Sequence, residues 1–377
     1  MNFELSDEQE LIRKTVRDFA ESKVAPVAEE LDREARFPYE IVAELAELGL
    51  MGLPIPEEYG GAGGDTVSYA IAIEELTRID SSVAITVAAH TSLGTMPILL
   101  FGNEEQKREW LPKLASGQGL AAFGLTEPDA GSDAGATRTK AELRDGQWVI
   151  DGSKIFITNA GTDISACVTI TAVTGENEIS NIVVPNGTPG YEISAPMKKL
   201  GWHASDTREL SFHSCAVPEG NLLGERGRGF QQFMEILNGG RISVAAMGVG
   251  LAQGAYDLAL GYAKERRQFG KPIAEFQAIQ FQLADMATEI DAGRQLVYKA
   301  AWLKDHGREY ALAAAQAKLF TGLLSNRVVN SSLQIHGGYG FMEEFAISRL
   351  YRDQKILEIG EGTNEVQRMV IARHLGL

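Results

Sequence analysis

The sequence predicts an α+β, mainly α-helical protein in which a β domain lies between two helical domains. Alanine, leucine and glutamate recur at helical spacing up to about residue 117. Short runs rich in Val, Ile, Thr and aromatic residues then alternate with turn residues, and helical spacing returns after Gly229. We therefore expect an N-terminal helical domain over residues 1–117, a middle β domain over 118–227 and a C-terminal helical bundle domain over 228–377.

The composition is that of a globular chain with an acidic surface. Its 377 residues include 35 Lys and Arg against 51 Asp and Glu, a net charge of −16, which argues against nucleic acid or an anionic membrane as a partner. The two cysteines and six histidines show no metal-ligand spacing, so neither a metal site nor a disulfide framework is expected. Residues 1–20 lack the pattern of a targeting signal, and the longest apolar runs, such as Val244–Ala255, are too short to span a bilayer. We expect a cytoplasmic protein without membrane insertion.

The N-terminal third is predicted to form a series of helices. Ser6 and Gln9 make a capping box before the first of them. Proline and glycine stop regular structure at Pro38, at Pro54 and in the loop Tyr59–Gly64. The expected helices cover residues 7–33, 38–49, 65–79, 81–101 and 104–116.

The middle segment is predicted to form an antiparallel sheet, because turn residues such as Asp145-Gly146 and Asp151-Gly152 separate its strands. No helix of convincing length interrupts the strands, so a parallel βαβ arrangement is not expected. The expected strands are Ala121–Leu125, Thr139–Leu143, Trp148–Ile150, Lys154–Thr158, Ala166–Thr174, Ile179–Val184 and Arg208–His213.

The C-terminal third returns to helical spacing. The pattern predicts a helix through Phe230–Leu237, a break at Asn238-Gly239-Gly240 and a long helix over Ile242–Arg266. Further helices are expected through Ile279–Val297 and over Ala311–Leu333. Near the end, a helix that stops at Gly360 and a final helix capped by Thr363 would leave Gly360-Glu361-Gly362 as a linker.

Several stretches could carry chemistry, and each also has an ordinary structural interpretation. Leu125–Asp133 offers hydroxyls and backbone N–H groups, and Phe156-Ile157-Thr158 combines an aromatic ring with a hydroxyl, which suits the edge of a flavin; either is more often an ordinary loop. The basic cluster Lys264–Lys271 is either a phosphate clamp or a solvated helix end, and Arg241 is either a ligand or half of an ion pair. Glu361 is a candidate catalytic base, because its glycine neighbours have no Cβ to block a flat ligand; the alternative is a structural linker.

Short motifs that occur in order along the chain carry a resemblance to a known family. They are Pro54–Gly61, Thr126–Pro128 with Ala130–Asp133, Phe156–Asn159, Lys199–Gly201, Glu265–Gly270, Gln334–Gly340, and Tyr351–Asp353 through Glu361–Thr363. Together they resemble the acyl-CoA dehydrogenase family from one end of the chain to the other, closest to its short-chain, butyryl-CoA dehydrogenase-like branch. The resemblance implies an N-terminal helical domain, a central β domain and a C-terminal four-helix bundle, with FAD between the last two.

The resemblance also implies which residues bind cofactor and substrate. Matching positions in the family hold the isoalloxazine ring, the pyrophosphate and the adenine of FAD, partly from a neighbouring subunit. The cofactor-binding residues are then Phe123, Leu125, Thr126, Gly131, Ser132, Phe156, Ile157, Thr158, Arg266, Gln277, Gln334, Ile335, His336, Gly337, Gly338, Thr363, Asn364 and Glu365. The substrate-binding residues are Ser132, Asn238, Arg241 and Gly362, although related enzymes often carry aspartate at the position of Asn238.

The implied reaction is the α,β-dehydrogenation of a short- to medium-chain acyl-CoA to the trans-2-enoyl-CoA. Glu361 removes the α-proton, flavin N5 takes the β-hydride, and the electrons pass to an electron-transferring flavoprotein. The resemblance further implies that the Glu361 N–H holds the thioester oxygen, and that the enzyme is a homotetramer of fatty acid β-oxidation. One branch of the family places its base immediately before the residue matching Arg241, where this chain has Gly240; that departure favours Glu361.

Two other functions stay open at this point. The same fold could serve a flavin oxidase or monooxygenase that uses O₂, or a CoA-binding scaffold without turnover. The preferred length and branching of the acyl chain depend on how residues such as Ala89–Leu99 close the floor of the pocket, and the sequence does not give that depth.

Overall fold

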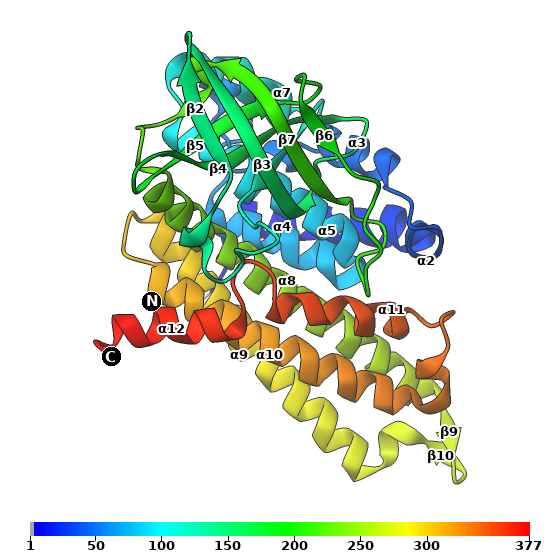
Figure 1. Cartoon of the computed structure of the whole chain (residues 1–377). Coiled ribbons are helices and arrows are strands. Elements are labelled where there is room, and N and C mark those ends of the chain that lie inside the picture. The colour runs from blue at the N-terminus through cyan, green and yellow to red at the C-terminus, as the bar shows by residue number, and fades with distance from the viewer. Residues whose placement is uncertain (1–3) are drawn as a thin grey trace.

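The computed structural model describes residues 4–377 and consists of a β domain packed on a large body of helices (Figure 1). The expected α+β class, with helical, β and helical segments in this order, is confirmed. In Figure 1 the sheet lies above α4 (Thr66–Ile79) and α5 (Ser81–Ala88), and the long C-terminal helices run below them.

The N-terminal helices follow the predicted ranges closely. The N–H of Gln9 donates to Ser6 Oγ (3.2 Å) and the N–H of Ser6 donates to Gln9 Oε1 (3.1 Å), which confirms the capping box. Two π-helical turns, Ala20–Val24 and Ala89–Thr95, lie within helices that the sequence pattern predicts as continuous. The remaining α-helices of this part are α1 (Asp7–Phe19), α2 (Ala25–Glu34), α3 (Tyr39–Glu47), α6 (Met96–Phe101) and α7 (Glu104–Ala115).

One continuous helical stretch in the described chain, Ser81–Phe101, is long and apolar enough to cross a membrane by length and composition. The expectation that every apolar run is too short for a bilayer is therefore wrong for this stretch. Inside the protein 78% of its most apolar window is buried, which is also how the core helix of a globular protein looks.

The strands form one eight-stranded sheet in the order β6-β7-β3-β2-β4-β5-β8, with β1 paired to β4. The pairing of β1 with β4 is parallel, so the prediction of a purely antiparallel sheet is wrong. The strands are β1 (Leu120–Gly124), β2 (Lys140–Arg144), β3 (Gln147–Thr158), β4 (Ser165–Gly175), β5 (Glu178–Pro185), β6 (Tyr191–Ile193), β7 (Thr207–Pro218) and β8 (Leu222–Leu223). The short strands β6 and β8 were not predicted.

β3 is one strand of 12 residues, where the sequence pattern predicts two strands and a turn at Asp151-Gly152. A Cβ on Gly152 would lie 2.6 Å from Thr139 Oγ1, so glycine is needed because β3 passes close to Thr139. The register between β3 and β7 shifts beside this glycine. The Asp-Gly pair therefore marks an irregularity within a strand and not its end.

The C-terminal helices include the longest of the described chain. α8 runs without interruption through Asn238-Gly239-Gly240, so the predicted break is wrong. A glycine costs a helix interior about 1 kcal/mol relative to alanine, and the packing of α8 against α4 and α10 outweighs that cost. These helices are α8 (Gly229–Glu265), α9 (Gln277–Asp305), α10 (Ala311–His336), α11 (Ala346–Asp353) and α12 (Asn364–His374), with the ribbon β9 (Arg267–Gln268) and β10 (Lys271–Pro272) between α8 and α9.

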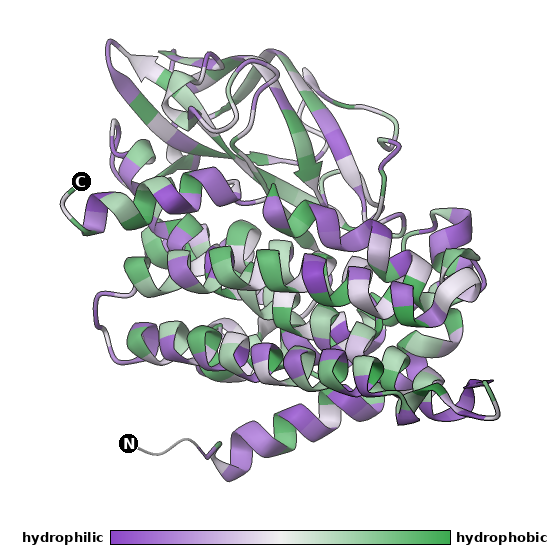
Figure 2. Ribbon diagram, turned by 90° about the horizontal axis from the view of Figure 1, so that it is seen from below, coloured by the Kyte–Doolittle hydropathy of each residue, from purple (hydrophilic) through white to green (hydrophobic). Residues whose placement is uncertain are grey.

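The first and last helical segments share one apolar core. Ile73 of α4 and Val249 of α8 are fully buried in it, whereas Trp148 lies in a separate core within the β domain. In Figure 2 hydrophobic stretches are plentiful on the helices of the body, while the N-terminal helix at its edge is largely hydrophilic. A smaller apolar cluster, centred on Phe123 and Phe233, joins β1 to α8.

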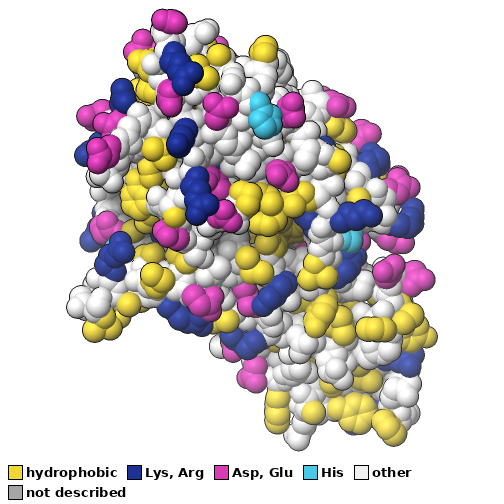
Figure 3. Space-filling model, in the orientation of Figure 1, with side chains coloured by type: hydrophobic (Ala, Val, Ile, Leu, Met, Phe, Trp, Pro, Cys, Tyr) yellow, Lys and Arg dark blue, Asp and Glu magenta, His cyan; other side chains and the backbone are white. Residues whose placement is uncertain are grey.

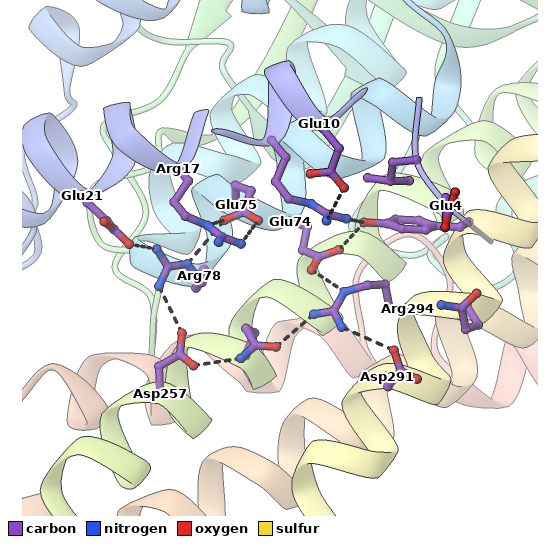
Figure 4. A pocket seen from close by; sticks show the side chains of 15 residues that line it. Glu4, Glu10, Arg17, Glu21, Glu74, Glu75, Arg78, Asp257, Asp291 and Arg294 are labelled. Atoms are coloured by element: carbon purple, nitrogen blue, oxygen red, sulfur yellow. Dashed lines mark hydrogen bonds and ion pairs between the residues drawn. The ribbon is translucent and has the colours of Figure 1, made fainter. Parts of the chain in front are cut away.

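A network of ion pairs surrounds a cavity of about 740 Å³ between α1, α4, α8 and α9 (Figure 4). Arg17 Nη2 lies 2.6 Å from Glu75 Oε1, and Arg294 Nε lies 2.8 Å from Glu74 Oε1. Because both glutamates are buried, each would be costly without its arginine. The network therefore holds α1 and α9 against α4.

Candidate active site

Glu361 lies in the linker between α11 and α12. α11 ends at Asp353 and a 3₁₀-helical turn follows over Gln354–Glu358, so the prediction that this helix runs on to Gly360 is wrong. Thr363 is the N-cap of α12, as predicted: its hydroxyl accepts a hydrogen bond from the N–H three residues later at 3.2 Å.

The backbone of the linker is unusual at the glutamate itself. Glu361 (φ +52°) and Gly362 (φ +90°) both lie in the left-handed region, which costs a residue other than glycine of order 1–3 kcal/mol unless its surroundings hold it. Lys318 Nζ of α10 donates to Gly362 O at 2.7 Å, and Gln367 Nε2 of α12 donates to the same oxygen at 2.9 Å. Contacts from two helices therefore fix the backbone that carries the carboxylate.

The Glu361 carboxylate is shielded from solvent, although the residue as a whole is partly exposed. Neither of its oxygens has a hydrogen-bond partner among residues 4–377. Burial raises the pKa of Glu361 to about 7, and the charges of Lys318 and Arg241 oppose that rise. A carboxyl group with a pKa near neutrality and unused lone pairs suits proton abstraction at physiological pH.

Gly240 of α8 makes room for this carboxylate. A Cβ at position 240 would lie 2.1 Å from Glu361 Oε2 and 3.3 Å from Leu93 Cδ2. Any larger residue there would push the carboxylate out of its position. The glycine that the sequence pattern interprets as a helix break is thus explained by the close approach of Glu361 to α8.

The predicted substrate residues Asn238 and Arg241 lie together one helical turn apart. Arg241, which is 1% exposed, donates from Nη1 to Asn238 Oδ1 at 2.6 Å, while its Nε has no partner within the described residues. Asn238 therefore orients Arg241, and this is the structural role that the hydrogen bond gives to Asn238. Because Arg241 also opposes the pKa rise of Glu361, both residues belong to the surroundings of the carboxylate.

The other two predicted substrate residues, Ser132 and Gly362, lie in different surroundings. Ser132 is exposed on the loop after β1, and that loop lies against the first turn of α8, because a Cβ on Gly135 would be 3.3 Å from Phe230 Cε2. A Cβ on Gly362 would lie 2.8 Å from Gln367 Nε2. The glycine at 362 is thus already required by the backbone and by its neighbour in α12.

The ends of β1 and β3 bring the predicted flavin residues of the β domain together. The N–H of Ile155 donates to Thr126 O at 2.9 Å, which places Phe123, Leu125 and Thr126 beside Phe156–Thr158. Phe156 is 62% exposed and Thr158 is partly exposed, whereas the side chain of Ile157 is buried in the core of the β domain. Only the main chain of Ile157 can therefore face a ligand outside the sheet.

An apolar wall connects these strand ends to Glu361. Phe123 packs in one cluster with Phe233 of α8, and Leu93 and Leu125 pack against it. Leu93 also lies next to Gly240, where the carboxylate sits. The β-domain residues and the candidate base thus border one region between the sheet and α8, and hydrophobic side chains gather on this part of the surface in Figure 3.

The three residues that begin α12 face different ways. Thr363 uses its hydroxyl as the helix cap, and Glu365 is exposed and paired with Arg368 at 2.9 Å. Asn364 is 3% exposed and faces α10, with an Oδ1 atom that has no partner among the described residues. Asn364 is therefore the one of the three that retains an unused buried acceptor.

The remaining predicted cofactor residues lie at the far end of the bundle. Arg266 stands over the ring of Tyr339 (5.4 Å) and His336 stacks on Tyr262 (4.5 Å), while Ile335 is buried and Gln277, Gln334, Gly337 and Gly338 are exposed. His336 is 18 residues beyond Lys318 on α10, which corresponds to about 27 Å along a helix. Within one chain these residues do not meet Glu361.

The residues at the strand ends fit a flavin. An exposed aromatic ring beside a threonine hydroxyl can stack on a heteroaromatic ring and donate a hydrogen bond to its edge. Lys154 is fully buried and donates to Leu125 O at 3.3 Å and to Glu127 Oε1 at 2.7 Å, so the loop after β1 is held firmly. No group of three or more His, Cys, Asp or Glu among residues 4–377 could hold a metal ion.

Sequence reasoning missed two buried residues near the candidate base. Lys318 is 0% exposed and contacts the linker, and Tyr69 of α4 is buried and lies close enough for the charge of Glu361 to help raise its pKa. A lone lysine in the alanine-rich stretch Ala313–Phe320 is a signal that could have identified Lys318. Tyr69 offers no comparable signal, because an aromatic residue on an apolar helix face is ordinary core.

Comparison with known proteins gives one consistent result. Three sequence profiles match: the acyl-CoA dehydrogenase N-terminal domain over residues 6–118, the middle domain over 122–215 and the C-terminal domain over 227–376. The chain is 53% identical over 380 residues to "Probable acyl-CoA dehydrogenase YngJ" of Bacillus subtilis, with 100% of both proteins covered.

Two solved structures are similar over the whole chain. One is butyryl-CoA dehydrogenase from Megasphaera elsdenii, with a TM-score of 0.97, 44% identity and 100% of both chains covered. The other belongs to a structure described as the electron transferring flavoprotein of Acidaminococcus fermentans, with a TM-score of 0.97, 44% identity and coverage of 100% of this chain and 99% of that chain.

Proposed function

Because the chain belongs to the acyl-CoA dehydrogenase family and is therefore an FAD-dependent enzyme that dehydrogenates acyl-CoA, we propose that Glu361 is the base that removes the α-proton. The observation that carries this proposal is the state of its carboxylate. Both oxygens are buried without a partner, and burial raises the pKa of Glu361 to about 7. Such a group is a stronger base than an exposed carboxylate and is still largely ionised at slightly alkaline pH.

FAD, when bound, supplies the acceptor for the β-hydride. Phe156, Thr158 and the end of β1 would hold its ring, and Arg266 with Gln334–Gly338 of another subunit would hold its distal part. The N–H of Glu361 makes no hydrogen bond within residues 4–377, so it can donate to the thioester oxygen and stabilise the enolate-like charge. Base and donor then belong to the same residue, which fixes their relative position.

The physiological setting follows from the same family. We propose a short- to medium-chain acyl-CoA as the substrate in fatty acid β-oxidation in the cytoplasm, an electron-transferring flavoprotein as the acceptor, and a homotetramer as the assembly. The similarity to butyryl-CoA dehydrogenase supports the short chain, and the similarity to the Acidaminococcus structure supports the acceptor. Anaerobic bleaching of the flavin by acyl-CoA thioesters of increasing length tests the chain preference, with butyryl-CoA expected among the fastest.

The test of the base is Glu361→Gln, which keeps the shape and removes the basic oxygen. The variant should bind FAD, and its flavin should be bleached by butyryl-CoA roughly 10²–10⁴-fold more slowly than that of the wild type. Glu343→Gln, an exposed glutamate before α11, is the matched control and should bleach at the wild-type rate. Bleaching of the Glu361→Gln flavin at the wild-type rate would exclude Glu361 as the base.

A further inference from the structure

Lys318 is a buried cation with an unusual set of partners. It lies on α10 within the alanine-rich stretch Ala313–Phe320 and is 0% exposed. Its one side-chain hydrogen bond in the described structure goes to Gly362 O at 2.7 Å, and it forms no salt bridge within 4.0 Å among residues 4–377. A buried ammonium without an ion-pair partner lowers the stability of the fold. The position of Lys318 next to the Gly360-Glu361-Gly362 linker therefore indicates a functional reason for its burial.

The hydrogen bond acts on the part of the backbone that is strained. Gly362 O belongs to the Gly362–Thr363 peptide, directly after the two residues Glu361 and Gly362 that have positive φ angles. Gln367 Nε2 approaches the same oxygen at 2.9 Å and Glu361 O at 3.4 Å. Lys318 from α10 and Gln367 from α12 thus hold one carbonyl from two sides, but only Lys318 brings a charge.

Among the charges around Lys318 and Glu361, the carboxylate of Glu361 is the anion that interacts most strongly with the ammonium of Lys318. Glu361 is the strongest of the anions that favour the charged form of Lys318, ahead of Glu358 and Glu365 from the two sides of the linker. Arg241 faces both groups from α8, and Tyr69 faces Glu361 from α4. Burial lowers the pKa of Lys318 to about 8 and raises that of Glu361 to about 7.

We propose that Lys318 is a positioning residue for Glu361: its ammonium fixes the carbonyl of the next residue, Gly362, and supplies the positive charge that keeps the neighbouring carboxylate ionised. The inference rests on the proposed role of Glu361 as base. A carboxylate without this charge would hold its proton more tightly, and fewer molecules would carry the basic form at neutral pH.

The test compares the pH dependence of kcat/KM in variants that separate the two roles. Lys318→Gln removes the charge and retains a donor, Gln367→Met removes the second donor without a charge change, and Lys355→Met removes an exposed lysine that pairs with Glu358 at 2.9 Å. Activity should fall as pH decreases through the pKa of the base. In Lys318→Gln this acid limb should move to higher pH by at least about one unit, because an opposite charge at close range is lost.

The other variants should behave differently. Gln367→Met should lower kcat with the acid limb left in place, and Lys355→Met should match the wild type in both. An acid limb of Lys318→Gln at the wild-type pH would overturn the proposed electrostatic role. A loss of activity equal at all pH values would likewise mean that Lys318 is only a structural contact.

A second measurement does not depend on the folding of Lys318 variants. Coupling between two charges is reciprocal, so the pKa of Lys318, followed by NMR of isotope-labelled lysine, should fall in Glu361→Gln relative to wild type. An unchanged pKa would contradict the proposal. If instead Glu361→Gln dehydrogenates butyryl-CoA at the wild-type rate, the proposed base is wrong, and that failure is distinct from a failure of Lys318 alone.

Discussion

At the scale of single residues, the reactivity proposed for Glu361 comes from interactions that its carboxylate lacks. Hydrogen bonds to its oxygens would stabilise the charged form and lower its pKa, but neither oxygen has such a partner in the described chain. Lys318 and Arg241 provide charge without a direct hydrogen bond to the carboxylate within the described residues. The sequence could identify Glu361 from its glycine neighbours and could mark Lys318 as a lone lysine among alanines, but it could not show the contact of Lys318 with Gly362, because that contact joins residues 44 positions apart.

Burying this carboxylate should reduce the stability of the protein at alkaline pH. The pKa of Glu361 is raised from 4.5 to about 7 in the folded state, so its burial is tolerated below pH 4.5, becomes progressively unfavourable between pH 4.5 and 7, and has its full cost above pH 7. Glu361→Gln should therefore increase the free energy of unfolding above pH 7 by up to about 3 kcal/mol, with little change at pH 4.5. Denaturant unfolding at the two pH values measures this, and equal effects at both would contradict the assignment of the raised pKa.

At the scale of elements, the features that depend on neighbouring residues were predicted correctly from the sequence. The features that depend on tertiary packing were not. The capping box of α1 and the Thr363 cap of α12 depend on residues three positions apart, and both are confirmed. The continuity of α8 depends on its packing against α4 and α10, which outweighs the preference of its glycines. The parallel pairing of β1 with β4 joins strands more than 40 residues apart, and strand periodicity contains no information on the partner.

The geometry of α8 predicts opposite outcomes for two neighbouring substitutions. Gly240→Ala would place a Cβ 2.1 Å from Glu361 Oε2, so the carboxylate must shift and kcat/KM should fall by on the order of 10²-fold. Gly239→Ala meets only Lys304 Nζ at 3.5 Å, an ordinary contact, and should keep wild-type kcat/KM. Either alanine should favour the helix by about 1 kcal/mol where it fits. Equal kinetics for the two variants would show that Gly240 does not make room for the base.

At the scale of the whole molecule, the predicted FAD residues fall into two groups that one chain keeps apart. Those at the strand ends lie near Glu361, whereas Arg266 and Gln334–Gly338 lie at the far end of the bundle, next to the ribbon β9–β10 in Figure 1. Phe269 and Phe341 are 93% and 81% exposed at that end. Sequence motifs can identify the residues of both groups, but they cannot show whether the two groups contribute to the same FAD site within one chain. A second copy of the chain that covers this end would complete the site.

A substitution that prevents the assembly of subunits at this end of the bundle should therefore also prevent the protein from retaining FAD. Phe341→Asp introduces a charge into the exposed apolar end of the bundle and should lower the mass seen by light scattering from a multiple of 40.9 kDa toward the single chain. The same variant should lose FAD during gel filtration. Leu11→Asp, at a residue 64% exposed on α1, is the control and should keep both mass and FAD. A Phe341→Asp protein that is smaller but retains FAD would show that one chain holds the cofactor alone.

The exchange of the α-proton of a bound acyl-CoA with D₂O tests the base directly, because it reports proton removal without the hydride step. Wild-type holoenzyme should exchange the α-hydrogen at a rate that increases with pH through about 7, the pKa of Glu361. Above pH 7, Glu361→Gln with FAD bound should exchange it roughly 10²–10⁴-fold more slowly, and its rate should not increase through pH 7. Exchange by Glu361→Gln at the wild-type rate would contradict the assignment of Glu361 as the catalytic base.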